Sequence, residues 1–219
     1  MEKIIIFDFD YTLADSSEAP AECIRYAFKK LGLDVPSKER CQRTVGLSLS
    51  ETFKELSPED HSEKVESFCK YFLARADEVV VELTPLFDGV VDVLKALLIR
   101  GYKLGIASSK RYAPLIGILE KYNAVGLFSA IIGDDVVDNP KPYPDSIYKC
   151  LEDMGVPEDV LSQEIEIYYV GDSFKDAQLA QNANIPFIAV TSGTTTAEDF
   201  KRFKPYRIID SVSKLLTLF

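Results

Sequence analysis

The sequence predicts an α/β protein in which a doubly wound parallel sheet is interrupted by an inserted all-helical domain. Two observations carry this prediction. Short apolar runs alternate with helical stretches along most of the 219 residues, and one long N-terminal interval breaks the alternation because it contains helical patterns only. A chain of this length, with 47% hydrophobic residues, can bury a sizeable core.

The first predicted strand, Lys3 to Phe7, is a continuous apolar run that ends at Asp8. A run without polar alternation is typical of a strand buried on both faces of a parallel sheet. Further strands of this kind are expected at Lys103 to Ala107, Ala130 to Ile132, Ile165 to Val170 and Phe187 to Val190. Helical patterns such as Val90 to Arg100 and Asp176 to Ala183 separate them, so the sheet is expected to be Rossmann-like.

The helical interval is predicted to form a separate domain of residues 16–81, inserted into an α/β core of residues 1–15 and 82–219. Its first helix carries its apolar residues on one face, at Cys23, Ile24, Ala27, Phe28 and Leu31. That pattern indicates that the inserted helices bury an apolar face.

Charge and hydropathy exclude several classes of partner. Twenty-five basic and 35 acidic residues give a net charge of -10, and no stretch combines Lys and Arg with aromatic residues, so nucleic acid is not expected to bind. No window approaches the roughly 18 to 20 apolar residues of a membrane span, and the N-terminus turns acidic too early for a signal peptide. We expect a cytoplasmic protein, a monomer or weak homodimer, with no membrane partner. The four cysteines lack CxxC spacing and are expected to be reduced.

Polar residues suited to phosphate and metal chemistry follow the first four predicted strands. They are Asp8 and Asp10 in DFDYT, Ser108 in IASSK, Lys141 in NPKPYPD, and Asp172 and Asp176 in YVGDSFKD. Because ligands of open α/β sheets bind beyond the carboxyl ends of the strands, these side chains are expected to converge.

Such a cluster suits a phosphate ester only with a cation present, because carboxylates alone repel a dianion. Mg²⁺ commonly takes a few protein oxygens, keeps several waters and contacts the substrate phosphate, which fits two or three aspartates. Asp8 and Asp10 can divide the chemistry, one attacking phosphorus while the other protonates the leaving oxygen and then activates water. Lys141 would add a fixed positive charge.

Each motif alone has a simpler interpretation. An isolated DxD pair commonly caps a turn, Ser108 or Ser109 can cap a helix that begins near Arg111, and Lys141 can be an ordinary solvated lysine. The order DFDYT, IASS, KPYPD and GDSFKD resembles, over almost the whole chain, the four motifs of the haloacid dehalogenase superfamily. Within it, the helical insertion resembles the cap of the phosphoglycolate phosphatase-like branch.

The resemblance implies a Mg²⁺-dependent phosphatase that hydrolyses small-molecule phosphate monoesters through an aspartyl-phosphate intermediate. Asp8 would be the nucleophile and a metal ligand. Asp10 would be the general acid and base, its backbone carbonyl also meeting the metal, and Asp172 a further metal ligand. The retained Asp10 favours phosphate-ester chemistry, because dehalogenases of the superfamily carry an aromatic residue there and phosphonate hydrolases an alanine.

The resemblance also assigns the supporting residues. Ser108 would hydrogen-bond the phosphoryl oxygens, Lys141 would hold the nucleophile and the phosphate together, and Asp176 would order metal-bound water. Ser109 and Lys110 are expected at the rim of the site, with Ser109 among the phosphate-binding residues.

Several positions bear on substrate contacts and local geometry. The loop from Thr44 to Ser48, including Gly46, would contact the substrate from the cap, although Gly46 could equally end one helix before Ser48 begins the next. Leu49 stands where the related β-phosphoglucomutases carry an arginine, which disfavours a mutase. Tyr11 stands where the family usually has glycine, so the turn after Asp10 must tolerate a bulky residue.

Two further segments lie at the ends of predicted strands. The segment Val190 to Gly193, followed by Thr196 to Phe200, resembles the C-terminal part of phosphoglycolate phosphatase-like proteins. Tyr168 and Tyr169, beside the fourth motif, are expected to pack the strand, because aromatic residues commonly fill such positions.

The alternatives are a β-phosphoglucomutase-like phosphomutase, a pyrophosphatase or nucleotidase, and, outside enzymes, a phospho-receiver or binding module. A receiver also places aspartates, a hydroxyl and a lysine at the carboxyl edge of a parallel sheet. It needs neither a nucleophile on the first strand nor a GDxxxD motif after the lysine nor an inserted helical domain.

Overall fold

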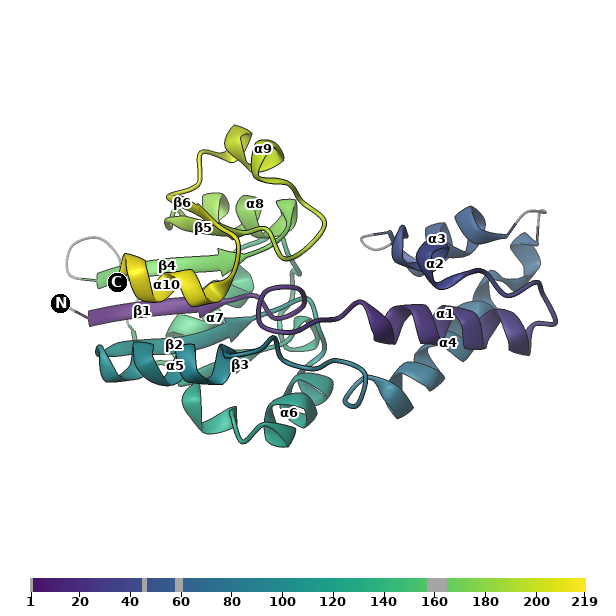
Figure 1. Cartoon of the computed structure of the whole chain (residues 1–219), viewed down its shortest axis with the longest axis horizontal. Coiled ribbons are helices and arrows are strands. Elements are labelled where there is room, and N and C mark those ends of the chain that lie inside the picture. Colours follow the sequence, from purple (N-terminus) through teal and green to yellow (C-terminus); the bar gives the residue numbers. More distant parts are fainter. Residues whose placement is uncertain (1, 45–46, 58–60, 157–164) are drawn as a thin grey trace. The chain divides into compact units, whose positions relative to one another are not determined.

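The computed structural model describes residues 2–44, 47–57, 61–156 and 165–219 and divides into two compact units (Figure 1). The α/β unit comprises Met1–Asp15 and Leu86–Phe219, and the helical unit comprises Ser16–Pro85. The chain rejoins the α/β unit at an antiparallel bridge between Ala14 and Leu86. The helical unit therefore extends to Pro85, a few residues past the boundary expected after residue 81.

The α/β unit is built on one sheet of six parallel strands in the order β3-β2-β1-β4-β5-β6. The strands are β1 Glu2–Phe7, β2 Tyr102–Ala107, β3 Ala130–Ile132, β4 Ile165–Gly171, β5 Phe187–Val190 and β6 Arg207–Ile209. This arrangement confirms the predicted doubly wound parallel sheet and adds β6, which the sequence did not indicate. β6 is short, and Arg207 is exposed at its start.

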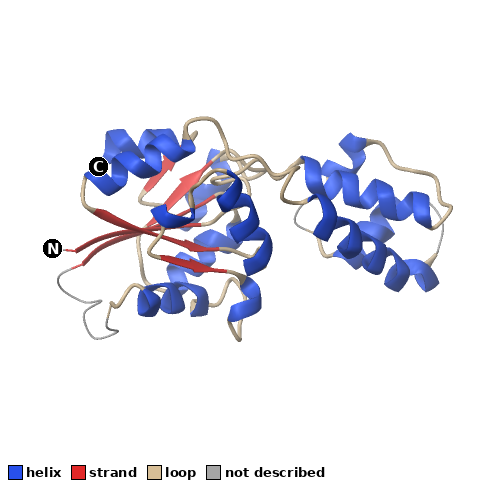
Figure 2. Cartoon of the chain, turned by 90° about the horizontal axis from the view of Figure 1, so that it is seen from below, coloured by secondary structure: helices blue, strands red, loops and turns tan. Residues whose placement is uncertain are grey.

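Helices cover both faces of the sheet (Figure 2). They are α5 Val90–Ile99, α6 Tyr112–Lys121, α7 Asp145–Asp153, α8 Phe174–Asn182, α9 Ala197–Phe200 and α10 Leu215–Leu218. Short 3-10 helices occur at Ser62–Lys64, Val125–Leu127, Asp134–Val136, Lys201–Phe203 and Val212–Lys214.

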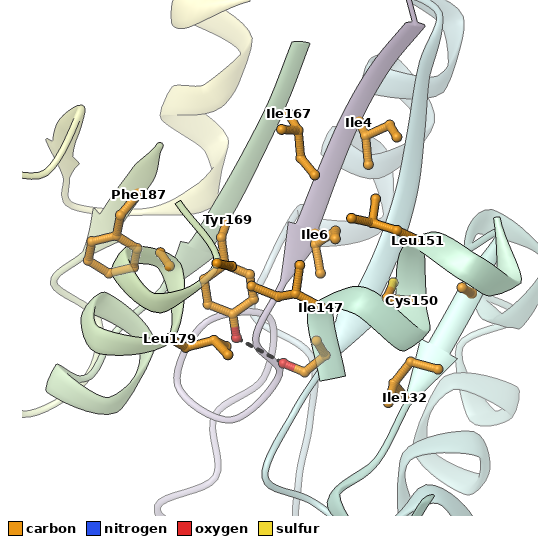
Figure 3. Close-up of a cluster of buried hydrophobic side chains, with 14 of the residues drawn as sticks. Ile4, Ile6, Ile132, Ile147, Cys150, Leu151, Ile167, Tyr169, Leu179 and Phe187 are labelled. Carbon is orange, nitrogen blue, oxygen red and sulfur yellow. Dashed lines mark hydrogen bonds between the residues drawn. The ribbon is translucent and has the colours of Figure 1, made fainter. Parts of the chain in front are cut away.

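Strand β1 is the centre of the core. Ile4 and Ile6 pack with residues of α7 and α8 on one face (Figure 3), and Ile5 and Phe7 are equally buried. Because successive side chains of a strand point to opposite faces, β1 is buried on both sides, as its apolar run predicted.

The helical unit has a hydrophobic core of its own. Its helices are α1 Glu18–Lys30, α2 Lys38–Gln42, α3 Leu49–Leu56 and α4 Val65–Val79. The buried rings of Phe28, Phe53 and Phe68 meet with centroids 5.0 to 5.6 Å apart. Ser48 and Glu51 form a capping box at the start of α3. Across the described residues, no helix combines the length and apolar character needed to span a membrane.

Candidate active site

Three aspartates form a buried carboxylate cluster at the carboxyl edge of the sheet. Asp8 follows β1, Asp172 follows β4, and Asp176 lies in the first turn of α8. An oxygen from each carboxylate lies within 4.8 Å of the others. Because β1 and β4 are parallel neighbours, with the Asp8 amide donating to the Val170 carbonyl at 2.8 Å, their C-terminal aspartates must emerge side by side.

Two glycines leave room for this cluster. A Cβ on Gly171 would lie 2.5 Å from Cγ of Asp176, and one on Gly193 would lie 1.9 Å from Oδ2 of Asp172. Both distances are below the 3.0 Å that real Cβ atoms essentially never cross. The backbone therefore approaches both carboxylates as closely as only glycine allows.

Lys141 joins the cluster from the loop before α7. Its buried ammonium donates to Oδ1 of Asp8 at 2.6 Å, to Oδ1 of Asp176 at 2.8 Å and to the Tyr169 hydroxyl at 2.6 Å. Burial alone would lower the pKa of Lys141, but Asp176 and Asp8 outweigh it and raise the pKa above its ordinary value. Lys141 is thus a fixed positive charge.

The opposite oxygen of Asp176 is held by its own helix. Oδ2 accepts from the Ser173 amide at 3.0 Å, and the Asp176 amide donates to Oγ of Ser173 at 3.3 Å. This capping box orients Asp176 so that Oδ1 faces Lys141 and the cluster.

The cluster carries more negative charge than Lys141 can offset. Burial, opposed by Lys141, raises the pKa of Asp8 from 3.8 to about 7. Burial together with Asp8 and Asp176 raises the pKa of Asp172 from 3.8 to about 9. Ionised, the three carboxylates leave two negative charges uncompensated, which matches a divalent cation with oxygen ligands. The residues therefore fit a metal ion held by Asp8 and Asp172.

Asp10 lies outside this cluster. Oδ1 of Asp10 is 3.0 Å from the ammonium of Lys110, whose side chain is only 13% exposed. Lys110 was expected at the rim of the site, and the structure adds to that expectation an ion pair with Asp10. The motif order gave no signal for this contact, because a lysine after IASS is equally suited to solvent.

The turn after Asp10 is held from two sides. Tyr11 has a left-handed backbone, with φ at 57°, and its amide donates to the Ala14 carbonyl at 2.8 Å. A left-handed residue is least strained as glycine, which explains why glycine suits this position in the superfamily. The Ser192 hydroxyl donates to the Tyr11 carbonyl, and Thr12 Oγ1 lies 3.4 Å from Oδ1 of Asp172. The turn therefore accommodates the bulky residue.

Of the four predicted phosphate-binding residues, Lys141 lies in the buried cluster beside Asp8, and the other three are placed differently from one another. Ser108 is buried at the end of β2, where its hydroxyl accepts from the Lys110 amide at 3.2 Å, whereas Ser109 is exposed. Arg111, and neither serine, is the N-cap residue of α6. Gly46 lies outside the described residues.

Tyr169 is a site residue that the sequence reasoning missed. It packs among the buried apolar side chains beside the strand, as expected (Figure 3). Its hydroxyl also donates to the Ala107 carbonyl at 2.8 Å, lies 3.1 Å from Oδ1 of Asp176 and accepts from Lys141. Strand alternation places it on the sheet face that carries α7 and α8, beside the Lys141 loop. This alternation is the feature of the sequence that could have identified Tyr169 as a site residue.

Comparisons with known proteins agree with this geometry. A family model described as haloacid dehalogenase-like hydrolase matches residues 5–190. The chain is 31% identical over 234 residues to a phosphoglycolate phosphatase from Shigella boydii, covering 97% of this chain and 90% of that protein. It is 29% identical over 216 residues to the pyrophosphatase PpaX from Listeria monocytogenes, covering 98% and 94%. A crystal structure of a haloacid dehalogenase-like hydrolase from Bacteroides fragilis matches with a TM-score of 0.82 at 31% identity, covering 98% of this chain and 100% of that one.

Proposed function

Since the chain belongs to the haloacid dehalogenase-like hydrolase family, we propose that it is a Mg²⁺-dependent phosphatase that hydrolyses small-molecule phosphate monoesters through an aspartyl-phosphate on Asp8. The observation that carries the proposal is the buried Asp8–Lys141 contact beside Asp172 and Asp176, with its uncompensated negative charge. A carboxylate held by a buried ammonium, next to oxygen ligands for a divalent cation, suits attack on phosphorus.

In the first half of the reaction, a carboxylate oxygen of Asp8 attacks phosphorus and the bond to the leaving oxygen breaks. Asp10 gives its proton to that oxygen, so the alcohol departs neutral. Bound Mg²⁺, held by the carboxylates of Asp8 and Asp172 and the backbone carbonyl of Asp10, would offset the charge of the phosphate dianion. Lys141 adds positive charge where the phosphoryl group transfers.

In the second half, water attacks the phosphorus of the aspartyl-phosphate while Asp10 accepts its proton. The bond between phosphorus and Asp8 breaks, which releases inorganic phosphate and regenerates the Asp8 carboxylate and the protonated Asp10. Because Asp10 must carry a proton when it acts as the acid, its ion pair with Lys110 has to give way at that step. Ser108 would donate to a phosphoryl oxygen from the end of β2.

The helical unit, on this proposal, is the cap that selects the leaving group. A phosphoglycolate phosphatase and a pyrophosphatase both match this chain over nearly its whole length, so small phosphate monoesters and pyrophosphate are the substrates to test first. Leu49 provides no cation for a second phosphate group, which disfavours a phosphomutase.

The proposal is tested by phosphate release from phosphoglycolate, a panel of sugar phosphates and nucleotides, and pyrophosphate, with and without Mg²⁺. Asp8→Asn should lose essentially all turnover, because an amide is a poor nucleophile and a weak ligand for Mg²⁺. The matched control is Asp153→Asn, since Asp153 is exposed at the end of α7 and pairs only with a surface lysine among the contacts described.

Three results would contradict the proposal. Substantial turnover by Asp8→Asn would remove Asp8 as the nucleophile. An isomerised sugar phosphate without free phosphate would favour the phosphomutase, and a long-lived aspartyl-phosphate without turnover would favour the receiver.

A further inference from the structure

We propose that Tyr169 is a positioning residue for phosphoryl transfer, whose hydroxyl aims the Lys141 ammonium at Asp8. The inference rests on the proposed function and adds to it a residue outside the four motifs. Its basis is the arrangement of donors and acceptors around one buried ammonium.

The hydrogen bonds around Lys141 define the role of the tyrosine. An ammonium has three N–H donors and no acceptor, and the structure pairs it with Asp8, Asp176 and the Tyr169 oxygen. The Tyr169 oxygen must therefore accept from Lys141. Its single proton then goes to another group, and the Ala107 carbonyl at 2.8 Å is nearer than Oδ1 of Asp176 at 3.1 Å.

The tyrosine side chain has fewer rotatable bonds than the lysine side chain, so its ring fixes the position of its hydroxyl. Tyr169 is fully buried on the central strand β4 and stacks on Phe187 with ring centroids 6.5 Å apart. Lys141 instead stands on a flexible four-carbon stem in a loop. The ring places its oxygen at one fixed point, and that point restricts where the ammonium can lie.

The hydroxyl also connects elements that are not neighbours in the sheet. Tyr169 belongs to β4, whereas Ala107 ends β2, and β1 lies between these strands. Two hydrogen bonds of one hydroxyl therefore link the end of β2, directly before Ser108, to the lysine that contacts Asp8. Loss of the hydroxyl would leave one N–H of Lys141 and the Ala107 carbonyl without this partner in a buried site.

The test compares Tyr169→Phe with Tyr168→Phe. The first keeps the packed ring and removes only the hydroxyl. The second is a matched control on the same strand, because the Tyr168 hydroxyl instead donates to Glu166 at 3.2 Å. We measure kcat and KM with the best substrate at saturating Mg²⁺, the melting temperature, and a crystal structure of each variant and of the wild type.

For Tyr169→Phe we expect kcat to fall by about tenfold while KM stays within about twofold, because the lost contact acts on the nucleophile more than on substrate binding. In its crystal structure the Lys141 ammonium should have left the 2.6 Å contact with Asp8. Tyr168→Phe should match the wild type in kcat, in KM and in the position of the Lys141 ammonium.

The inference is overturned by a wild-type kcat in Tyr169→Phe, by an equal loss in Tyr168→Phe, or by a loss of kcat with Lys141 unmoved. Failure of the proposed function is distinguishable, because it would appear as a wild-type protein that releases no phosphate. In that case the crystal structures still decide: displacement of Lys141 from Asp8 supports the positioning role, and an unmoved Lys141 refutes it.

Discussion

Substitution of Gly193 by alanine tests the proposed metal site without replacing any proposed metal ligand. The new Cβ would lie 1.9 Å from Oδ2 of Asp172, 1.1 Å short of the 3.0 Å closest approach, and its three nearest atoms all belong to the Asp172 side chain. The carboxylate can rotate away more easily than backbone can move. The substitution is therefore expected to displace the Asp172 carboxylate.

A shift of about 1 Å in a catalytic geometry costs roughly 100-fold in rate, so we expect Gly193→Ala to lower turnover by about that factor. The Mg²⁺ concentration for half-maximal activity should rise by about tenfold, since a displaced carboxylate loses on the order of 1.4 kcal/mol of metal binding or more. Because the side chain absorbs the collision, the melting temperature should change little.

The assay is phosphate release titrated with Mg²⁺, together with thermal unfolding. Gly126→Ala is the matched control, because nothing lies within 4 Å of its added Cβ. Wild-type turnover and Mg²⁺ dependence in Gly193→Ala would refute the argument. So would a large fall in melting temperature with unchanged Mg²⁺ dependence, since the collision would then act on the fold and leave the metal site intact.

Three further predictions concern protonation, the second half-reaction and the helical unit. Asp8 and Asp172 have pKa values raised from 3.8 to about 7 and about 9, so without metal the native state holds more protons than the unfolded chain over that range. The free energy of unfolding in EDTA should therefore fall as the pH rises from about 5 to about 9, and the stabilisation that added Mg²⁺ provides should increase over the same range. Urea denaturation at each pH, with and without Mg²⁺, measures both quantities. An unfolding free energy that does not change with pH would contradict the raised pKa values. Asp10→Asn should slow both protonation of the leaving group and hydrolysis of the phosphoenzyme. With a substrate that has a good leaving group, intact mass spectrometry should therefore detect the aspartyl-phosphate. Wild-type rates in this variant would show that Asp10 is not the general acid and base. Phe53→Ala should cost about 3–5 kcal/mol of unfolding free energy, because it removes one of three buried rings that pack against one another. A loss below about 1 kcal/mol in urea denaturation would show that the cluster contributes little.

The sheet could be predicted from the sequence because its signals are local. The run Lys3 to Phe7 needs no partner to be recognised as a buried strand, and the observed β1 differs from it by one residue at its start. β6 could not be recognised in the same way, because its three residues begin with an exposed arginine. β6 forms where it does because it pairs in parallel with β5, and this pairing cannot be recognised from three residues of sequence.

The order of the motifs could predict which residues follow the strands of the sheet, but not the contacts that the loops make. Lys141 and Asp8 lie 133 residues apart, yet both follow strands of one sheet, so their convergence could be expected. The pairing of Asp10 with Lys110 and the closeness of Gly193 to Asp172 depend on the path of two loops. No pattern along the chain encodes such paths.

The position of β1 in the sheet sets an order of assembly during synthesis. β1 leaves the ribosome before β2 and β4, yet Lys3 of β1 pairs with Tyr102 on one side and Glu166 on the other. The helical unit, contiguous from Ser16 to Pro85, can fold while β1 still lacks both partners. Until β4 is translated, the nascent protein therefore carries an apolar strand with an open edge, the kind of segment that chaperones shield from aggregation.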